Sequence, residues 1–374
     1  MKIGYDAESA FHNTEEMGNF SRTLLSGMLK LHPENEYQLF STGKELELPY
    51  FIRSLNESKA PWKMTKIGFL GKVASIFGWG SKVSSKNTDI YHGLSNELPV
   101  DWKQTKVKSI VTFHDLNFIR FQEEYRAIDK WAFDKKYSFA TKNADLIIAT
   151  STQTKLDLEE FYPASIGKIK VIYQDTHFAF HYRKRTEAVA KILYKFDIVE
   201  RPYILCVNRL DKRKNLKILV EAFKKIFQQI PEDLVLVGER GDAADEILDQ
   251  LSSFDGRLRW LGKVETDDLV NLYDGCSFTV NPSVFDGFSI PLLESMRREK
   301  AIVASKIFCF EEIAGTAAIY AEPGSSDDFA SQLFELSSNT SLRKQLEIAS
   351  QNECKRFDPT KLTEKIHELY VVLR

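Results

Sequence analysis

The feature that most constrains the fold is an alternation of short β-rich runs with stretches of helical periodicity, which occurs twice along the chain. In the first half, the predicted strands are residues 2–5, 37–40, 89–91, 109–113, 146–149 and 168–173. From Arg201 the pattern restarts with YILCV, LVLVG, RLRWL and CSFTVNP, separated by helical stretches. Such alternation is typical of parallel sheets covered by helices. We therefore expect an α/β fold made of two doubly wound domains.

The length of 374 residues fits two domains, each able to bury its own core. The interval 181–200 shows no strand pattern and contains a basic cluster at 183–185, so we expect the connection there. This divides the chain into a first domain, 1–182, and a second, 183–358. Asp358 followed by Pro359 predicts a final helix that begins at 359, because an acid caps the helix and proline fits its first position.

Composition and charge exclude several classes of protein. The chain is 43% hydrophobic and 28% charged, as expected of a folded domain, and no apolar stretch approaches the length of a membrane span. Its net charge of -2 gives no overall attraction to nucleic acid. The cysteines form no close pair, so we expect neither a disulfide framework nor a metal site. No signal peptide is recognised, and we expect a cytoplasmic protein without a cofactor.

The segment 281–296, NPSVFDGFSIPLLESM, carries the most information about function. It follows an apolar strand and opens a helix with Pro291 near its start. Gly287 lets the backbone turn sharply, and the amides around Ser289 and Ile290 would point along the helix axis. Unpaired amides and the helix dipole favour an anion there. In open parallel sheets such a turn lies beyond the carboxyl ends of the strands, where ligands bind.

Two acids bracket this turn: Asp286 before the helix and Glu294 in its first turn. A carboxylate beside a phosphate site repels the phosphate unless it serves another part of the ligand, and sugar hydroxyls are suitable partners. A sugar joined to a diphosphate would satisfy both needs. The alternative is structural, with Asp286 as a helix cap and Glu294 favouring the helix dipole.

The segment resembles the paired-acid motif of the retaining glycosyltransferases of family 4, which have the GT-B fold of two Rossmann-like domains facing across a cleft. Family members usually carry Glu, Gly, Phe, Gly, an aliphatic residue, Pro, two further residues and Glu; here Asp286 replaces the first Glu and Ser289 the second Gly. The resemblance implies that Asp286 contacts the donor sugar and that a final helix, 359–374, returns to the first domain. The other residues it assigns to the donor in this segment are Gly287, Phe288, Ser289, Ile290 and Glu294.

A basic turn follows the first strand of the second half, in CVNRLDKRKNLKILVEAF. Arg209 and Lys214 would stabilise a departing nucleoside diphosphate, because two cations offset its negative charge. They match the Arg and Lys of the family pattern, while Asn208 and Asn215 take the places of its glycines. A solvated basic turn is the alternative. Further along, the resemblance places the backbone around Val264 against the nucleobase.

The first half contributes Gly18, in the turn after the first strand, and His114, at the end of another strand. Gly18 would let the backbone approach the phosphates closely, although a simple helix entry is the alternative. The resemblance places His114 against the donor sugar near the reacting carbon, whereas a lone histidine at a strand end is otherwise structural. The loop with His92, Ser95 and Asn96 is interpreted as facing the acceptor.

The segment 51–86 is locally cationic, with basic residues opposed only by Glu57. Its bulky apolar residues include Trp62 and Trp79. This composition suits peripheral contact with anionic lipid head groups or a phosphorylated acceptor, and a solvated loop is the alternative. The segment therefore predicts peripheral contact with the inner face of a membrane.

The resemblance implies a metal-independent hexosyltransferase that moves a sugar, with retained configuration, from a nucleotide sugar to a sugar or lipid-linked acceptor, in polysaccharide or glycolipid assembly. We expect front-face attack, in which the diphosphate held by Arg209 and Lys214 accepts the acceptor's proton. The alternatives are a nucleotide-sugar epimerase, which would convert donor without acceptor, and a non-catalytic nucleotide-sugar-binding protein. A nicotinamide dehydrogenase is disfavoured, because no G-x-G-x-x-G follows a strand.

Overall fold

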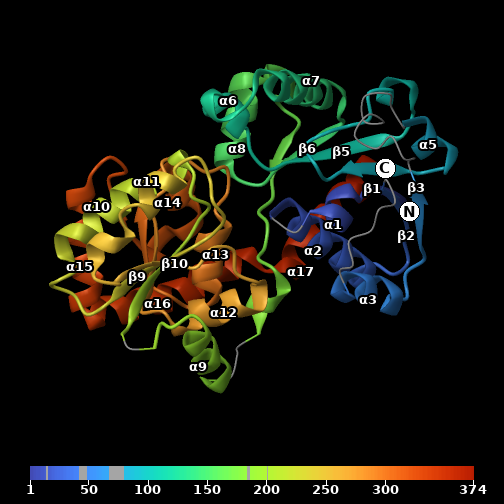
Figure 1. The fold of residues 1–374 in the computed structure, drawn as a ribbon. Helices are drawn as coiled ribbons and strands as arrows, with labels where there is room; N and C mark the ends of the chain where they lie inside the picture. Colours follow the sequence, from blue (N-terminus) through green and yellow to red (C-terminus); the bar gives the residue numbers. More distant parts are fainter. Residues whose placement is uncertain (14–15, 42–48, 67–79, 183–185, 200) are drawn as a thin grey trace. The chain divides into compact units, whose positions relative to one another are not determined.

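The computed structural model describes residues 1–13, 16–41, 49–66, 80–182, 186–199 and 201–374. The chain divides into two compact units. The first unit comprises Met1–Asp175 together with Phe357–Arg374, and the second comprises Thr176–Arg356. The division between the units therefore precedes the predicted boundary at 182. Figure 1 shows that each unit contains a sheet covered by helices.

The first unit contains a parallel sheet, and its seven strands in the described residues have the order β3-β2-β1-β4-β5-β6-β7. The strands are β1 (Lys2–Asp6), β2 (Glu36–Ser41), β3 (Trp62–Lys66), β4 (Ile90–Gly93), β5 (Lys108–Phe113), β6 (Leu146–Ala149) and β7 (Ile169–Val171). The helices are α1 (Glu8–His12), α2 (Glu16–Leu31), α3 (Pro49–Glu57), α5 (Gly80–Ser85), α6 (Asn117–Arg120), α7 (Ala127–Asn143), α8 (Thr152–Phe161) and α17 (Pro359–Leu373).

The second unit repeats this architecture, and the strands of its described part have the order β10-β9-β8-β11-β12-β13. They are β8 (Tyr203–Val207), β9 (Asp233–Val237), β10 (Leu258–Trp260), β11 (Phe278–Asn281), β12 (Ile302–Ser305) and β13 (Ala318–Ala321). The helices are α9 (Thr186–Lys195), α10 (Leu216–Ile226), α11 (Ala244–Leu248), α12 (Thr266–Gly275), α13 (Ile290–Arg297), α14 (Phe308–Ala314), α15 (Ser326–Ser338) and α16 (Thr340–Glu353).

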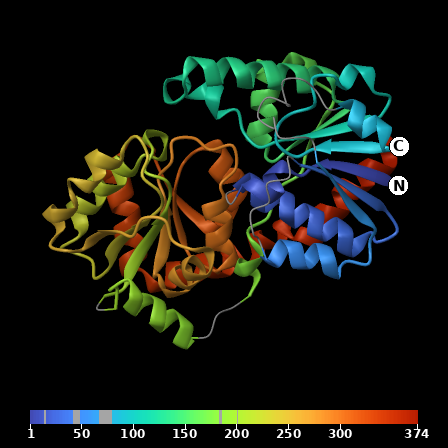
Figure 2. The same ribbon diagram turned by 45° about the vertical axis from the view of Figure 1, so that its right-hand side comes forward.

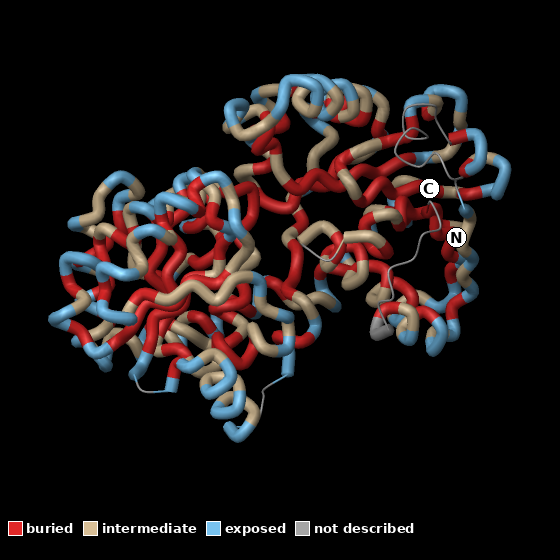
Figure 3. The backbone as a smooth tube through the Cα atoms, viewed as in Figure 1, coloured by how far each residue is buried: buried red, intermediate tan, exposed pale blue. Residues whose placement is uncertain are grey.

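The cores lie between each sheet and its helices, as Figure 3 shows by the buried strands inside both units. Central strands such as β9, with the sequence DLVLV, are buried along their whole length because helices cover both faces of a parallel sheet. Amphipathic helices complete the cores: α10 places Leu219, Val220 and Phe223 in the core of the second unit. Apolar burial of this kind is the main stabilising term in folding.

The predicted two-domain α/β fold is confirmed, and so is the return of the final helix. The side chain of Asp358 accepts a hydrogen bond from the Lys361 amide at 3.0 Å, which caps α17. Helix α17 packs against α2, and Leu362 and Ile366 join the core of the first unit. In Figures 1 and 2, the red α17 lies beside the blue helices of that unit.

The sequence analysis missed one strand, β3, which lies inside the cationic segment 51–86. It pairs with β2 as the edge of the sheet, with Tyr37 opposite Trp62. Lys63 and Lys66 on this strand are exposed, and lysines are common on edge strands because they discourage pairing with another chain. Trp62 is half-buried and packs against the core of the first unit. Residues 67–79, with Trp79, lie outside the described residues.

None of the described helices has both the length and the apolar character that a membrane span requires.

Candidate functional site

The candidate site lies at the carboxyl ends of β8 and β11, the two neighbouring strands at the centre of the second sheet. The strand order reverses between them, because β9 and β10 extend to one side and β12 and β13 to the other. Loops diverge at such a reversal and leave space for a ligand. The chain leaves β8 into the basic turn 208–215 and leaves β11 into the turn 282–289. The sheet topology therefore brings together the two motifs that the sequence analysis singled out.

An ion-pair cluster joins the two turns. Lys214 Nζ lies 2.6 Å from Asp286 Oδ1, and Arg213 Nη1 lies 3.1 Å from the same oxygen. The Asp286 side chain is 5% exposed, so its charge is removed from water and requires these partners. Asp286 Oδ2 is buried and has no hydrogen-bond partner among the described residues. Two cations against one carboxylate give this cluster a net positive charge.

Helix α13 begins beside this cluster without a side-chain cap. Ser289 occupies the N-cap position, and its side chain makes no capping hydrogen bond to an α13 amide. Instead, Ser289 Oγ accepts a hydrogen bond from Asn281 Nδ2 at 3.0 Å. Pro291 lies in the first turn, as predicted. The start of α13 combines backbone donors with the positive end of the helix dipole, and this combination favours an anion.

Two details of the predicted turn differ in the structure. Gly287 does not adopt a positive φ, so no left-handed backbone requires a glycine there. Its carbonyl accepts a hydrogen bond from Cys309 Sγ at 3.4 Å. Glu294 lies beyond the first turn of α13, in which the structure places no acidic residue.

Glu294 is held by a neighbouring helix. Tyr273 on α12 donates a hydrogen bond from its hydroxyl to Glu294 Oε2 at 2.9 Å, and both residues are buried. Burial raises the pKa of Tyr273 well above its usual value, and the nearby Glu294 carboxylate raises it further. Tyr273 therefore stays protonated and fixes one oxygen of the carboxylate.

An asparagine network that the sequence analysis missed supports both turns. Asn208 Nδ2 donates to Asn281 Oδ1 at 3.2 Å, and Asn281 in turn donates to Ser289. Asn215 adopts a left-handed conformation with φ 56°, which explains why it can replace a glycine. Its side chain donates to the Pro282 carbonyl at 3.0 Å and so ties the basic turn to the turn after β11. The sequence did contain a signal for this network, because Asn208 and Asn215 replace the two glycines of the family motif.

The remaining predicted residues of the second unit lie around this cluster in different ways. Arg209 does not join it: its side chain is 58% exposed and pairs with Asp211 at 3.2 Å. Phe288 is buried and Ile290 is half-buried at the start of α13. Val264 is half-buried between β10 and α12 and packs against the core.

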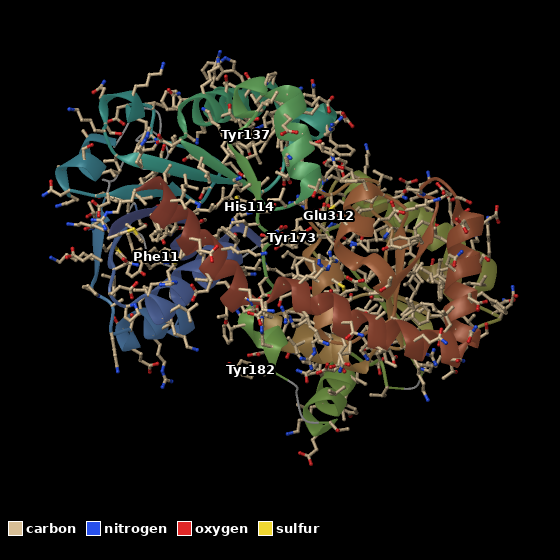
Figure 4. The ribbon with its side chains drawn as sticks, turned by 180° about the vertical axis from the view of Figure 1, so that it is seen from behind. Phe11, His114, Tyr137, Tyr173, Tyr182 and Glu312 are labelled. Atoms are coloured by element: carbon tan, nitrogen blue, oxygen red, sulfur yellow. The ribbon has the colours of Figure 1, made fainter. Side chains whose placement is uncertain are left out.

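His114 lies in the first unit, at the carboxyl end of β5, and is labelled in Figure 4. It is buried, and its Nε2 donates a hydrogen bond to the Leu94 carbonyl at 3.0 Å, so the ring orientation is fixed. Burial lowers the pKa of His114, although the Leu94 carbonyl and Asp115 oppose that shift. The imidazole is therefore held neutral at neutral pH.

Gly18 occupies the first turn of α2 in the same unit. A Cβ atom at this position would lie 1.8 Å from the Asn13 carbonyl oxygen. The glycine therefore permits close packing of the chain against the start of α2, which is the structural alternative for this residue. Glu16, two residues earlier, accepts a hydrogen bond from Gln174.

The loop interpreted as facing the acceptor requires a correction at His92. This side chain is fully buried, with Nδ1 2.6 Å from the Tyr370 hydroxyl and Nε2 2.8 Å from Thr112 Oγ1. Burial, followed by the neighbouring His114, lowers the pKa of His92 to about 3. His92 therefore belongs to the core of the first unit and offers no surface to an acceptor.

The comparisons with known proteins concern both halves of the chain. Residues 201–339 match the family described as glycosyl transferases group 1. The O-antigen chain mannosyltransferase B of Escherichia coli is 23% identical, and the alignment covers 100% of both chains. A Campylobacter jejuni N-acetylgalactosaminyltransferase, named for a diacetylbacillosaminyl-diphospho-undecaprenol substrate, is 26% identical over 59% of this chain and 58% of its own length.

Among solved structures, Anabaena Alr3699/HepE in complex with UDP superimposes with a TM-score of 0.74 and 19% sequence identity. The superposition covers 100% of both chains. At this identity the similarity concerns the fold, and it confirms the predicted architecture of two Rossmann-like domains.

Proposed function

We propose that this chain, which belongs to the glycosyl transferases group 1, transfers a hexose from a nucleoside diphosphate sugar to a hydroxyl of a sugar or lipid-linked acceptor, with retention of anomeric configuration. The observation that carries the proposal is the ion-pair cluster of Lys214, Arg213 and Asp286, which lies beside the start of α13, where no side chain caps the helix. Cations and backbone donors suit a diphosphate, and a buried carboxylate suits sugar hydroxyls. A nucleotide sugar presents both chemistries in one molecule.

In the proposed ground state, the diphosphate occupies the start of α13 and takes Lys214 as a partner. Asp286 then shares its cations with the phosphates and turns its unpartnered Oδ2 toward a sugar hydroxyl. Glu294, fixed by Tyr273, accepts hydrogen bonds from the ribose hydroxyls. Arg209, which is exposed in this structure, can rotate to a phosphate by giving up its contact with Asp211. Exposed ion pairs of this kind contribute little stability, so the exchange costs little.

The proposed chemical step is a front-face displacement. The acceptor oxygen forms a bond to the anomeric carbon while the bond between that carbon and the diphosphate oxygen breaks. The proton of the acceptor hydroxyl passes to the departing diphosphate. Lys214 and the amides of α13 stabilise the charge that develops on the diphosphate, and stabilisation of developing charge is commonly the largest single contribution to enzyme catalysis. His114, neutral and fixed by its Nε2–H bond to Leu94, can accept a hydrogen bond from a sugar hydroxyl at Nδ1.

The relatives support the choice of acceptor class. The Escherichia coli relative is named for O-antigen chain synthesis, and the Campylobacter jejuni relative carries a diphospho-undecaprenol substrate in its name. We propose that this chain likewise extends a cell-surface polysaccharide or glycolipid on a lipid-linked acceptor. Contact with the inner face of an anionic membrane through 51–86 fits this acceptor. The described basic residues of that segment are all exposed: Arg53, Lys59, Lys63, Lys66, Lys82 and Lys86.

The experiment that tests the proposed reaction is a turnover assay with UDP, GDP and ADP sugars, each with and without sugar-diphospholipid acceptors. The expected result is release of nucleoside diphosphate that depends on the acceptor, with a product whose anomeric configuration by NMR equals that of the donor. Conversion of the donor without acceptor would indicate an epimerase. Saturable donor binding without turnover with any acceptor would favour a binding protein.

A further inference from the structure

Two buried hydrogen-bond acceptors lie beyond the carboxyl ends of strands in the first unit. His114 follows β5 and Gln174 follows β7, and their exposed fractions are 5% and 1%. Among the described residues, neither His114 Nδ1 nor Gln174 Oε1 has a hydrogen-bond partner. Figure 4 labels His114 and, one residue before Gln174, Tyr173. Most buried polar atoms in proteins are paired, so two unpartnered acceptors at this edge of the sheet require an explanation.

The contacts of His114 fix both its position and its tautomer. Its Nε2 donates to the Leu94 carbonyl at 3.0 Å. A carbonyl can only accept, so Nε2 carries the proton and Nδ1 of the neutral ring is left as an acceptor. The backbone is held as well: the His114 amide donates to Asn96 Oδ1 at 2.8 Å, and its carbonyl accepts from the hydroxyls of Thr150 and Thr154, both at 3.0 Å. The lone pair on Nδ1 therefore has a fixed direction.

The side-chain amide of Gln174 is oriented by Glu16, the first residue of α2. Gln174 Nε2 donates to Glu16 Oε1. The reversed amide would place Oε1 against this carboxylate, two acceptors together, so the amide keeps its Oε1 away from Glu16. Burial lowers the pKa of His114, and the side chain of Gln174 is among the groups that oppose this shift. Only a protonated Nδ1 could donate to Oε1, so in the neutral state two acceptors lie next to each other.

The chemistry of this acceptor pair selects the kind of ligand that can occupy it. The described residues provide no donor to either atom, so the donor comes from a bound molecule. A diphosphate is unsuitable, because its ionised oxygens only accept hydrogen bonds. Two neighbouring hydroxyls of a sugar supply the two donors that the pair needs. A single water molecule could also supply both, and the experiment below separates these two occupants.

We propose that Gln174 is a specificity-determining residue for the transferred hexose: Gln174 Oε1 and His114 Nδ1 accept hydrogen bonds from two hydroxyls of that sugar. Glu16 is the positioning residue that holds the amide of Gln174. This inference rests on the proposed function and adds to it a residue that reads the sugar of the donor. Because both acceptors are buried, a sugar reaches them only after a local rearrangement. Its hydroxyls then pair away from water, where a missing hydroxyl weakens binding strongly.

The first test compares sugar nucleotides with nucleotides that lack the sugar. The full chain is titrated by calorimetry with UDP-glucose, GDP-mannose and ADP-glucose, and with UDP, GDP and ADP. Gln174→Met keeps a side chain of similar length and removes the acceptor. We expect the affinity for the sugar nucleotide to fall by roughly five- to tenfold and the affinity for the nucleoside diphosphate to stay unchanged. Gln38→Met is the matched control, because Gln38 is also buried in the first unit and donates to the Lys63 carbonyl at 3.0 Å. It should change neither affinity.

The second test uses analogues of the bound sugar nucleotide that each lack one hydroxyl of the hexose. Removal of one particular hydroxyl should weaken binding to the parent by roughly five- to tenfold and to Gln174→Met much less, because groups in contact give non-additive effects. Glu16→Ala should reduce this discrimination, since the amide is no longer held. Glu16→Gln should restore it, because its amide oxygen can still accept from Gln174 Nε2. A merely structural role of Glu16 would leave the discrimination unchanged.

Two results would overturn the inference alone while the parent still transfers sugar. The first is a folded Gln174→Met, checked by circular dichroism, that binds sugar nucleotides as the parent does or loses nucleoside diphosphates equally. The second is a set of deoxy analogues whose losses are the same in the parent and in Gln174→Met, which would show that water and not the sugar occupies the acceptor pair. A parent chain that binds no sugar nucleotide would overturn the proposed function, and this inference with it.

Discussion

The carboxyl edges of the two sheets differ in whether their buried polar side chains are charged or neutral. In the second unit, the edge carries ionised partners: Asp286 lies between Lys214 and Arg213. In the first unit, the equivalent edge carries polar groups that burial keeps neutral, such as His92 and His114, whose pKa values are lowered. Two sheets of similar topology thus provide different environments. Ionised side chains suit a phosphate-bearing donor, whereas neutral hydrogen-bonding groups suit hydroxyls.

Asp6 extends this comparison to a carboxyl group. It lies buried at the end of β1, and burial, followed by the nearby Glu97, raises its pKa to about 7. Asp286 is about as buried but has two cations beside it, whereas no cation is among the groups that shift the pKa of Asp6. For Asp6, burial without a neighbouring cation therefore raises the pKa.

The largest expected effect concerns the charged edge. Lys214→Ala removes the best-placed cation and should lower kcat/KM for sugar transfer by ~10²-fold or more, because the leaving diphosphate loses a charged partner. Steady-state kinetics with saturating acceptor measure this. Lys217→Ala is the matched control, since Lys217 forms an exposed pair with Glu246. Near-normal kinetics in Lys214→Ala would remove Lys214 from its assigned role.

The next prediction separates packing from phosphate contact in the first unit. Gly18→Ala would force its Cβ atom against the Asn13 carbonyl, so we expect destabilisation by about 1–3 kcal/mol. Denaturant unfolding followed by circular dichroism measures it. Gly324→Ala is the control, because a Cβ atom there meets nothing within 4 Å. If Gly18→Ala kept full stability but bound donor poorly, the role in phosphate approach would be favoured over packing.

A smaller effect is expected where a hydrogen bond positions the second acid. Tyr273→Phe removes the hydroxyl that holds Glu294 Oε2. We expect donor affinity to fall by roughly tenfold, since hydrogen bonds to charged groups contribute about 1.5–3 kcal/mol, and kcat at saturating donor to change less. Tyr194→Phe is the control, because Tyr194 is 79% exposed. A fall in kcat with unchanged donor affinity would contradict the assigned ribose contact.

The last prediction tests the neutral edge by pH. The folded pKa of Asp6 is raised to about 7 from the ordinary 3.8, so the folded state binds its proton more tightly than the unfolded state does. This contribution to stability is complete below pH 3.8 and is lost as the pH rises through about 7. Asp6→Asn cannot ionise and should therefore gain stability relative to the parent between these values. Thermal unfolding at a series of pH values measures the difference, and a constant difference across this range would contradict the raised pKa.

The fold could be predicted from the sequence because the buried strands are apolar and regularly spaced. Strand β3 could not, since WKMTK at the sheet edge carries two exposed lysines and no apolar run, and so resembles a solvated segment. Within the site, the positions of Lys214 and Asp286 followed from their motifs, but the ion pair between them depends on the adjacency of β8 and β11. Arg213 was one of several basic residues in its turn, and its role depends on backbone geometry. The stacked contact between His32 and His367 could not be predicted, because residues 335 positions apart meet only in the folded chain.

The most direct measurement is a crystal structure of the chain with a nucleoside diphosphate bound. The account predicts that the phosphates lie at the start of α13, within hydrogen-bond distance of the Ser289 and Ile290 amides and of Lys214 Nζ. Phosphorus atoms found away from that turn, with the contact between Lys214 and Asp286 unchanged, would contradict it.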